Sequence, residues 1–176
     1  MDRAPAEALT GIVNRSTAMS DASSDTSGVR FPPPLIYAGG FAAGYGAHRL
    51  MPIRLWPEPP AVERLLGWGL LVAGVLLAVG AAYLFRRAGT TPNPAQPTSA
   101  LVLGGPYHFT RNPMYLGMAT LYLGGTLLLN DPWPLAFLPV VLALVQRYVI
   151  AREEAYLERR FGDAYRAYKA RVRRWM

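Results

Sequence analysis

Two blocks of the sequence combine acidic, basic and aromatic residues in a way that could form a binding site. The first covers residues 101–117 (LVLGGPYHFTRNPMYLG) and the second covers residues 152–175 (REEAYLERRFGDAYRAYKARVRRW). Each block adjoins a long apolar segment, and elsewhere in the chain acids, arginines and tyrosines do not gather in this way. We therefore expect the two blocks to come together and enclose one pocket at a membrane surface.

The two adjacent acids of the second block, Glu153 and Glu154, directly follow an apolar segment. Ionisable groups at this depth are costly and usually face a cavity or a partner. Neighbouring residues of a helix point about 100° apart, so one carboxylate can face a cavity while the other meets water or an arginine. One interpretation is an ion pair with Arg111, Arg147 or Arg152. The other is a carboxylate directed at a cationic or hydroxyl-bearing ligand.

The first block contains groups that suit the opposite wall of such a pocket. Asn112-Pro113 is typical of a helix start, because asparagine is a favoured N-cap and proline is favoured at the first helical position. Tyr107 and Tyr115 offer faces on which an aromatic ring can stack, and Arg111 can hold a carboxylate by charge-assisted hydrogen bonds. This combination predicts a small-molecule site.

Composition excludes several kinds of chemistry. The chain has no cysteine and only two distant histidines, so we expect no metal centre and no cysteine nucleophile. Lysine occurs once, at Lys169, which argues against Schiff-base catalysis. No Gly-x-Gly-x-x-Gly follows a strand-like segment, so a soluble Rossmann-type site is excluded as well.

Long apolar segments must position the two blocks. Residues 65–85 carry no charge, and at roughly 1.5 Å per residue they are long enough to cross a hydrocarbon core of about 30 Å. The expected transmembrane helices cover residues 32–51, 62–87, 113–129 and 133–150. We therefore predict an all-α integral membrane protein with about four transmembrane helices, preceded by a disordered tail at 1–30 and forming one domain at 31–176.

The C-terminal tail is predicted to form an amphipathic cytoplasmic helix in the plane of the membrane interface. Its aromatic and aliphatic residues recur at intervals of three and four, which places them on one helix face. These residues are Phe161, Tyr165, Tyr168, Val172 and Trp175.

Charge distribution predicts the orientation in the bilayer. The loop between the second and third expected spans carries three arginines and the tail from Arg147 onward carries nine basic residues, whereas the turn between the third and fourth spans carries none. The positive-inside rule then places the loop, the tail and both termini in the cytoplasm, on the inner membrane. The net charge of the chain is +7, and half of its eighteen basic residues lie next to a membrane segment. Anionic lipid headgroups are therefore the expected partner, and nucleic acid is not.

The two blocks together resemble the isoprenylcysteine carboxyl methyltransferase and phospholipid methyltransferase superfamily of integral membrane enzymes. The resemblance rests on three motifs in order between Leu101 and Trp175: LV-x-x-GPY, then R-N-P-x-Y-x-G, then a Glu-Glu pair before L-x-x-x-FG-x-x-Y-x-x-Y. It implies methyl transfer from S-adenosylmethionine to a lipid or lipophilic acceptor, with the cofactor bound mainly by residues 99–176.

The resemblance also implies roles for single residues. Those expected to contact the cofactor are Leu101, Val102, Tyr107, Asn112, Pro113, Met114, Tyr115 and Glu153. Arg111, Glu153 and Glu154 are the expected catalytic residues, and Arg147 and Arg152 are expected to contact the acceptor. Two positions depart from the pattern: Asn112 stands where many members have histidine, and Val149 stands where the prenylcysteine enzymes have arginine.

Some questions stay open at the level of sequence. The glycines of the third span, Gly117, Gly124 and Gly125, could shape a lateral route for the acceptor. A non-catalytic membrane adaptor with a relict pocket and an NADPH-dependent membrane reductase are the alternative functions. Neither the acceptor nor the oligomeric state follows from these residues.

Overall fold

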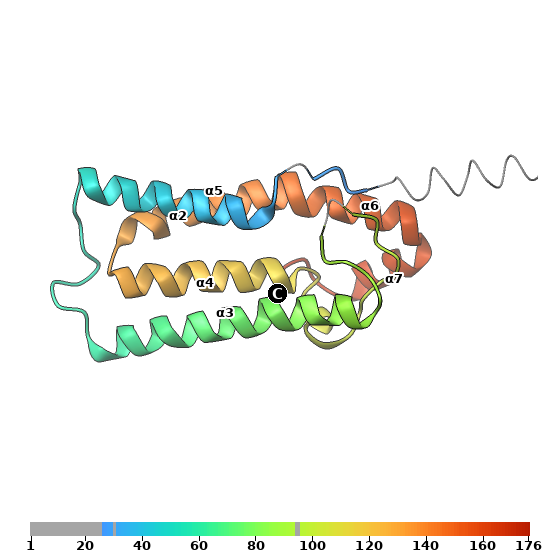
Figure 1. Cartoon of the computed structure of the whole chain (residues 1–176), viewed down its shortest axis with the longest axis horizontal. Helices are drawn as coiled ribbons and strands as arrows, with labels where there is room; N and C mark the ends of the chain where they lie inside the picture. Colours follow the sequence, from blue (N-terminus) through green and yellow to red (C-terminus); the bar gives the residue numbers. More distant parts are fainter. Residues whose placement is uncertain (1–25, 30, 94–95) are drawn as a thin grey trace, which may run out of the picture.

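The computed structural model describes residues 26–29, 31–93 and 96–176, so most of the tail predicted to be disordered lies outside the described residues. Within the described part all regular secondary structure is helical, which confirms the predicted all-α class. Figure 1 shows the helices, which are α2 (Pro33–Leu50), α3 (Ala61–Arg87), the short 3₁₀ helix η1 (Gly105–His108), α4 (Pro113–Leu129), α5 (Pro132–Val145), the π-helical turn η2 (Gln146–Ile150), α6 (Ala151–Phe161) and α7 (Asp163–Arg171).

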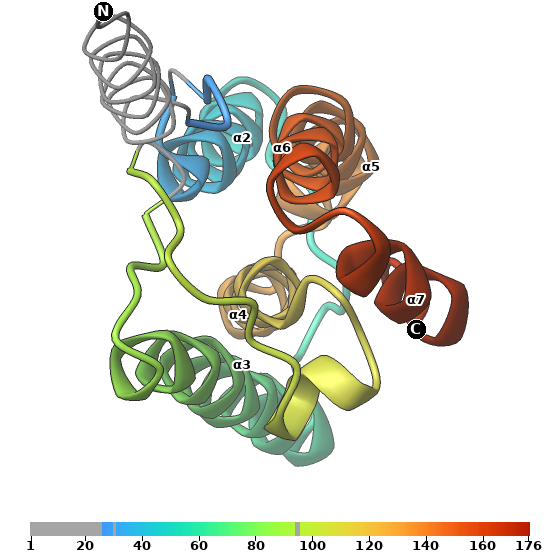
Figure 2. The same cartoon turned by 90° about the vertical axis from the view of Figure 1, so that its right-hand side faces the viewer.

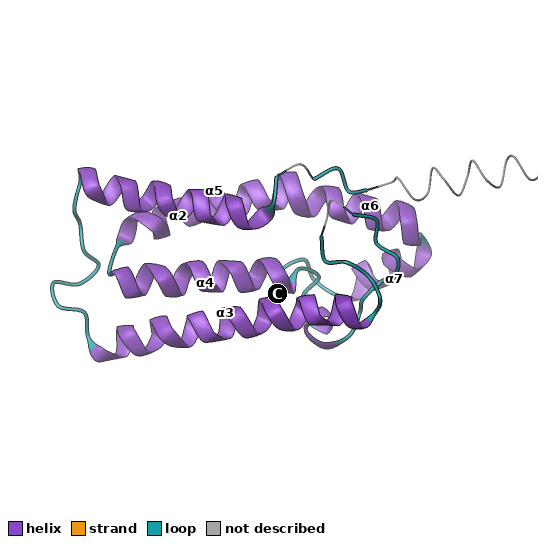
Figure 3. Ribbon diagram, viewed as in Figure 1, coloured by secondary structure: helices purple, strands orange, loops and turns teal. Residues whose placement is uncertain are grey.

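The long helices form two pairs, with α3 packed on α4 and α2 packed on α5. The view along the bundle shows α4 between α3 and the other pair (Figure 2). Buried side chains of α2, α4, α5 and η2 make the core, among them Tyr37, Tyr115, Tyr122, Val141 and Val145. The linker after α3 and the short helices α6 and α7 gather at one end of the bundle (Figure 3).

Two helices have the length and apolar composition needed to cross a membrane. They are α3, with 27 residues, and the continuous helix Pro132–Phe161, with 30 residues. Helix α4 is apolar but shorter, and α2 begins and ends within one residue of its predicted range. Among the described helices, transmembrane character is therefore indicated for these two, and crossing by α2 and α4 stays a prediction.

The fourth predicted span continues past its expected end. Helix α5 passes through η2 into α6 without a break, so Glu153 and Glu154 extend from the same helical rod that carries the apolar segment. The rod ends at Gly162, whose φ of 54° is in the left-handed region that glycine adopts without strain.

The prediction of one amphipathic helix through the tail is wrong. Gly162 divides it into α6 and α7, and α7 ends at Arg171. Tyr165 and Tyr168 are 2% and 5% exposed, because they pack into the protein instead of facing a membrane interface. The break turns α7 back toward the loop before α4.

Two of the three glycines singled out in α4, Gly117 and Gly124, pack against α3 and so line no route for the acceptor, whereas Gly125 lines a groove between α2 and α4. A Cβ added at Gly117 would lie 2.9 Å from the carbonyl oxygen of Gly74, and one added at Gly124 would lie 2.8 Å from that of Gly67. Small residues of this kind let two helices approach closely within a membrane. Tyr115, two residues before Gly117, is therefore carried by a tightly held helix.

Candidate cofactor site

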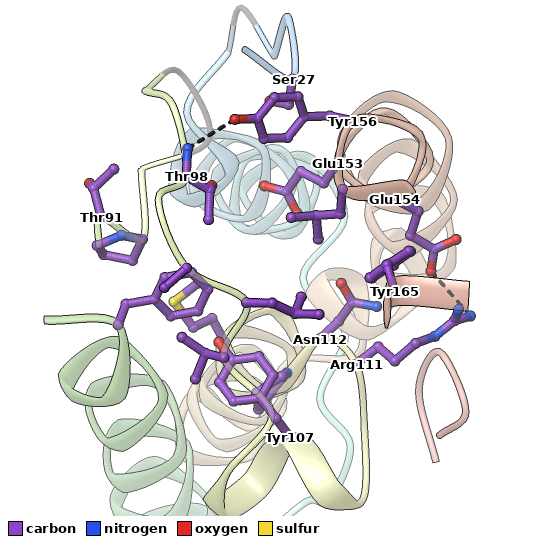
Figure 4. Close-up of a pocket in the computed structure, with 18 of the residues that line it drawn as sticks. Ser27, Thr91, Thr98, Tyr107, Arg111, Asn112, Glu153, Glu154, Tyr156 and Tyr165 are labelled. Carbon is purple, nitrogen blue, oxygen red and sulfur yellow. Dashed lines mark hydrogen bonds and ion pairs between the residues drawn. The ribbon is translucent and has the colours of Figure 1, made fainter. Parts of the chain in front are cut away.

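A pocket opens at the end of the bundle where the two sequence blocks meet (Figure 4). Its walls come from the linker before η1, from the first turn of α4, and from α6 and α7. All residues predicted to contact the cofactor line it, namely Leu101, Val102, Tyr107, Asn112, Pro113, Met114, Tyr115 and Glu153. The predicted catalytic residues Arg111 and Glu154 line it too.

The closest contact between the two blocks joins Tyr115 and Glu153. The Tyr115 hydroxyl donates a hydrogen bond of 2.6 Å to Oε1 of Glu153. Tyr115 is 3% exposed, and its carbonyl oxygen accepts a hydrogen bond of 2.9 Å from the Tyr37 hydroxyl of α2. Because α2, α4 and α6 all take part, the position of the Glu153 carboxylate is fixed by the bundle as a whole.

Glu154 points to a different partner. Its Oε1 lies 3.2 Å from Nη2 of Arg111, and Arg174 binds both of its oxygens through Nε at 3.0 Å and Nη2 at 2.6 Å. The 100° between adjacent helical residues thus separates a carboxylate facing the pocket, Glu153, from one held by arginines. Of the two interpretations offered by sequence, the ion pair applies to Glu154.

Several buried donors in this pocket have no partner among the described residues. They are Nε and Nη1 of Arg111 and the hydroxyl of Tyr107. Buried polar groups are nearly always hydrogen-bonded, so unpartnered donors on a pocket wall are available to water or to a bound molecule. Their chemistry suits an anion such as a carboxylate.

Two tyrosines of the pocket, Tyr107 and Tyr168, stay neutral. Burial, with the nearby Glu153 charge, raises the pKa of Tyr107 far above its ordinary value. Burial raises the pKa of Tyr168 to about 12, although Arg111 opposes the shift. The Tyr168 hydroxyl donates a 2.8 Å hydrogen bond to the Tyr107 carbonyl, and the Tyr107 ring packs edge-on against Phe85 at 5.7 Å. The Tyr168 phenol therefore serves as a hydrogen-bond donor, and the Tyr107 phenol keeps its proton available for donation.

Similarity to known proteins shows the family of this chain. The sequence pattern of the phospholipid methyltransferase family matches residues 62–164, which is more than half of the chain. The chain belongs to the phospholipid methyltransferase family. A match also exists to an uncharacterized protein of Haemophilus influenzae, 46% identical over 65 residues, which cover 36% of this chain and 100% of that protein. No solved structure matches the chain.

Membership of the phospholipid methyltransferase family indicates a methyltransferase that acts on lipids in a membrane. The matched residues run from α3 through α6, and they include every pocket wall except α7 and the segment of residues 26–29. The match to the family pattern thus includes most of the residues that line the pocket.

Two residues that the sequence assigned to the acceptor lie outside the pocket of this family member. Arg147 and Arg152 are exposed, and neither lines the pocket. Arg152 donates a 2.9 Å hydrogen bond to the carbonyl of Gly28 and lines a separate groove beside Leu144 and Tyr148. The structure therefore separates these arginines from Arg111.

Sequence reasoning missed several contributors to the site, among them Tyr156, Ser27 and Arg174. Tyr156 accepts a 2.9 Å hydrogen bond from the Thr98 backbone, which fastens the linker over α6. Ser27, placed by sequence in the tail, lines the pocket. Arg174 was read only as one more cation of the tail, and no sequence signal marks its pairing with Glu154.

Proposed function

We propose that this chain binds S-adenosylmethionine in the pocket and transfers its methyl group to a lipid or lipophilic acceptor. The observation that supports this most is the pairing of Tyr115 with Glu153 at 2.6 Å, opposite unpartnered donors of Arg111 and Tyr107. One side of the pocket is thus acidic and the other is rich in donors.

The residues present fit this cofactor. Its carboxylate requires hydrogen-bond donors, and Arg111 and Tyr107 have buried donors without partners. Its ammonium and sulfonium groups are cationic, and Glu153 is the carboxylate that faces the pocket. The apolar side chains of Leu101, Val102 and Met114 provide a surface for the remaining, less polar part.

The protein contributes mainly alignment to such a reaction. S-adenosylmethionine supplies a methyl group activated by its sulfonium, and displacement requires the acceptor atom in line with the bond that breaks. Correct orientation alone can remove a large part of the activation barrier in reactions of this type. Tyr115 and Glu153 would orient the cationic end, Arg111 the anionic end, and Glu154 would hold Arg111 in place. The linker fastened by Tyr156 would exclude water.

The pocket end of the bundle is the one we assign to the cytoplasm, with α2 and α4 completing a four-span domain and both termini on that side. The last turn of α3, which carries Arg86 and Arg87, lies at this end together with α6 and α7 (Figure 1), and Arg111 lines the pocket. For the acceptor, we infer an approach along the groove beside Leu144 and Tyr148, with the exposed Arg152 at its rim binding an anionic headgroup.

Transfer of a labelled methyl group tests this function. The full chain, reconstituted in lipid nanodiscs, is incubated with methyl-labelled S-adenosylmethionine and a total membrane lipid extract. We expect label in the organic phase, in amounts that increase with protein and time, together with S-adenosylhomocysteine. Absence of label from all lipids, while the same protein binds or consumes another nucleotide cofactor such as NADPH, would contradict the proposal.

A further inference from the structure

The last five residues, 172–176, leave α7 and fold across the loop before α4. We call them the C-terminal strap. The carbonyl oxygen of Arg173 accepts a 3.0 Å hydrogen bond from the backbone of Arg111, and that of Arg174 accepts bonds from the side chains of Thr110 (3.1 Å) and Asn112 (3.0 Å). The strap lies beyond the residues that match the family pattern. The strap is held in place because its own backbone carbonyl groups accept hydrogen bonds from loop residues 110–112.

The strap delivers the guanidinium of Arg174 to Glu154. Arg174 occupies both oxygens of this 6% exposed carboxylate, with bonds of 3.0 and 2.6 Å. Arg111 is left with one longer contact to Glu154, at 3.2 Å, through Nη2. The two-point pair that a carboxylate favours is therefore made with Arg174 and not with Arg111.

This arrangement leaves a charge imbalance beside the pocket. Two guanidinium groups share one carboxylate, and the Arg111 side chain is only 9% exposed. A buried charge needs a partner, and Nε and Nη1 of Arg111 have none among the residues described. An anion of a bound molecule is the complementary group.

We propose that Arg174 is a positioning residue, which neutralises Glu154 so that Arg111 stays available to the carboxylate of the methyl donor. The proposal rests on the function proposed above. Without Arg174, Glu154 would take Arg111 as its two-point partner, and Arg111 would be less available to a ligand in the pocket. The conservative change Arg174→Lys would keep the charge but not the planar pair of donors. We therefore expect its affinity for S-adenosylmethionine to lie between those of the wild type and of Arg174→Ala.

Titration calorimetry of the full chain in detergent tests this, with two probes: S-adenosylmethionine, and its decarboxylated form, which lacks the carboxylate. We expect Arg174→Ala to raise Kd for S-adenosylmethionine about tenfold or more, the effect of losing a hydrogen bond to a charged group. Kd for the decarboxylated probe should change little. Arg171→Ala removes the same charge from an exposed side chain of α7 and is the matched control.

A double variant separates this role from simple support of the strap. Glu154→Gln combined with Arg174→Ala removes the competitor for Arg111, so affinity for S-adenosylmethionine should recover relative to Arg174→Ala alone. Equal loss for both probes, or no recovery in the double variant, would overturn the proposal. If Arg174→Ala does not fold, as judged by thermal unfolding, Arg174→Lys and the double variant decide by the same two criteria. Absence of binding by the wild type would instead contradict the proposed function itself.

Discussion

Replacing Glu153 by glutamine is expected to lower methyl transfer to lipid about 100-fold or more, the range seen when a group that stabilises charge in an active site is removed. The substitution keeps the size of the side chain and one acceptor oxygen for the Tyr115 hydroxyl, which lies 2.6 Å away. It removes the only negative charge that we assign to the cationic end of the cofactor. Label transfer from S-adenosylmethionine to lipid measures the effect.

The matched control for this variant is Glu158→Gln. Glu158 is on the same helix, its carboxylate pairs with Lys169 at 3.1 Å, and it does not line the pocket. We expect the control to keep wild-type activity and the Glu153→Gln protein to unfold at a similar temperature. Activity of Glu153→Gln within a few-fold of the wild type would exclude the assigned role of this carboxylate.

The second large effect concerns stability. Gly117→Ala is expected to lower the free energy of unfolding by about 1–3 kcal/mol, the usual cost of overpacking. The added Cβ would lie 2.9 Å from the backbone nitrogen of Ala78 and 2.9 Å from the carbonyl oxygen of Gly74. Backbone atoms of α3 cannot move aside as a side chain can, so α3 and α4 must separate. Thermal unfolding in detergent measures the change.

Gly80→Ala is the control for this packing effect. Gly80 lies within α3, the helix against which Gly117 packs, but a Cβ at Gly80 would meet nothing within 4 Å. We expect its unfolding temperature to be unchanged or slightly raised, because alanine favours helix more than glycine does. An equal loss of stability in both variants would mean that the α3–α4 contact does not set the cost.

The sequence predicted those features that depend on local signals. The bounds of α4 were predicted as 113–129 and are Pro113–Leu129, because Asn112-Pro113 marks the start and Asn130, with φ of 52°, ends the helix. The pocket residues were predicted through motifs, and the structure brings them together. Even so, the Asn112 side chain does not cap the helix; it donates to the carbonyl of Arg174.

The missed features depend on the path of the chain. The spacing of aromatic residues at intervals of three and four continues through Gly162, so periodicity alone predicted one helix where a left-handed glycine makes two. The contacts of the C-terminal strap use backbone carbonyl groups, which any sequence provides. The pairing of Arg174 with Glu154, twenty residues apart, joins two side chains, but the tail holds several arginines and only the path of the strap decides which of them reaches Glu154.

Equilibrium binding of S-adenosylmethionine to the purified chain is the most direct test of a cofactor pocket shared by the loop before α4 and by α6. Titration calorimetry should show saturable binding to the wild type and to Glu158→Gln, and a strongly reduced affinity for Glu153→Gln. No binding to a folded wild-type protein, or equal affinity in the wild type and in Glu153→Gln, would contradict the account.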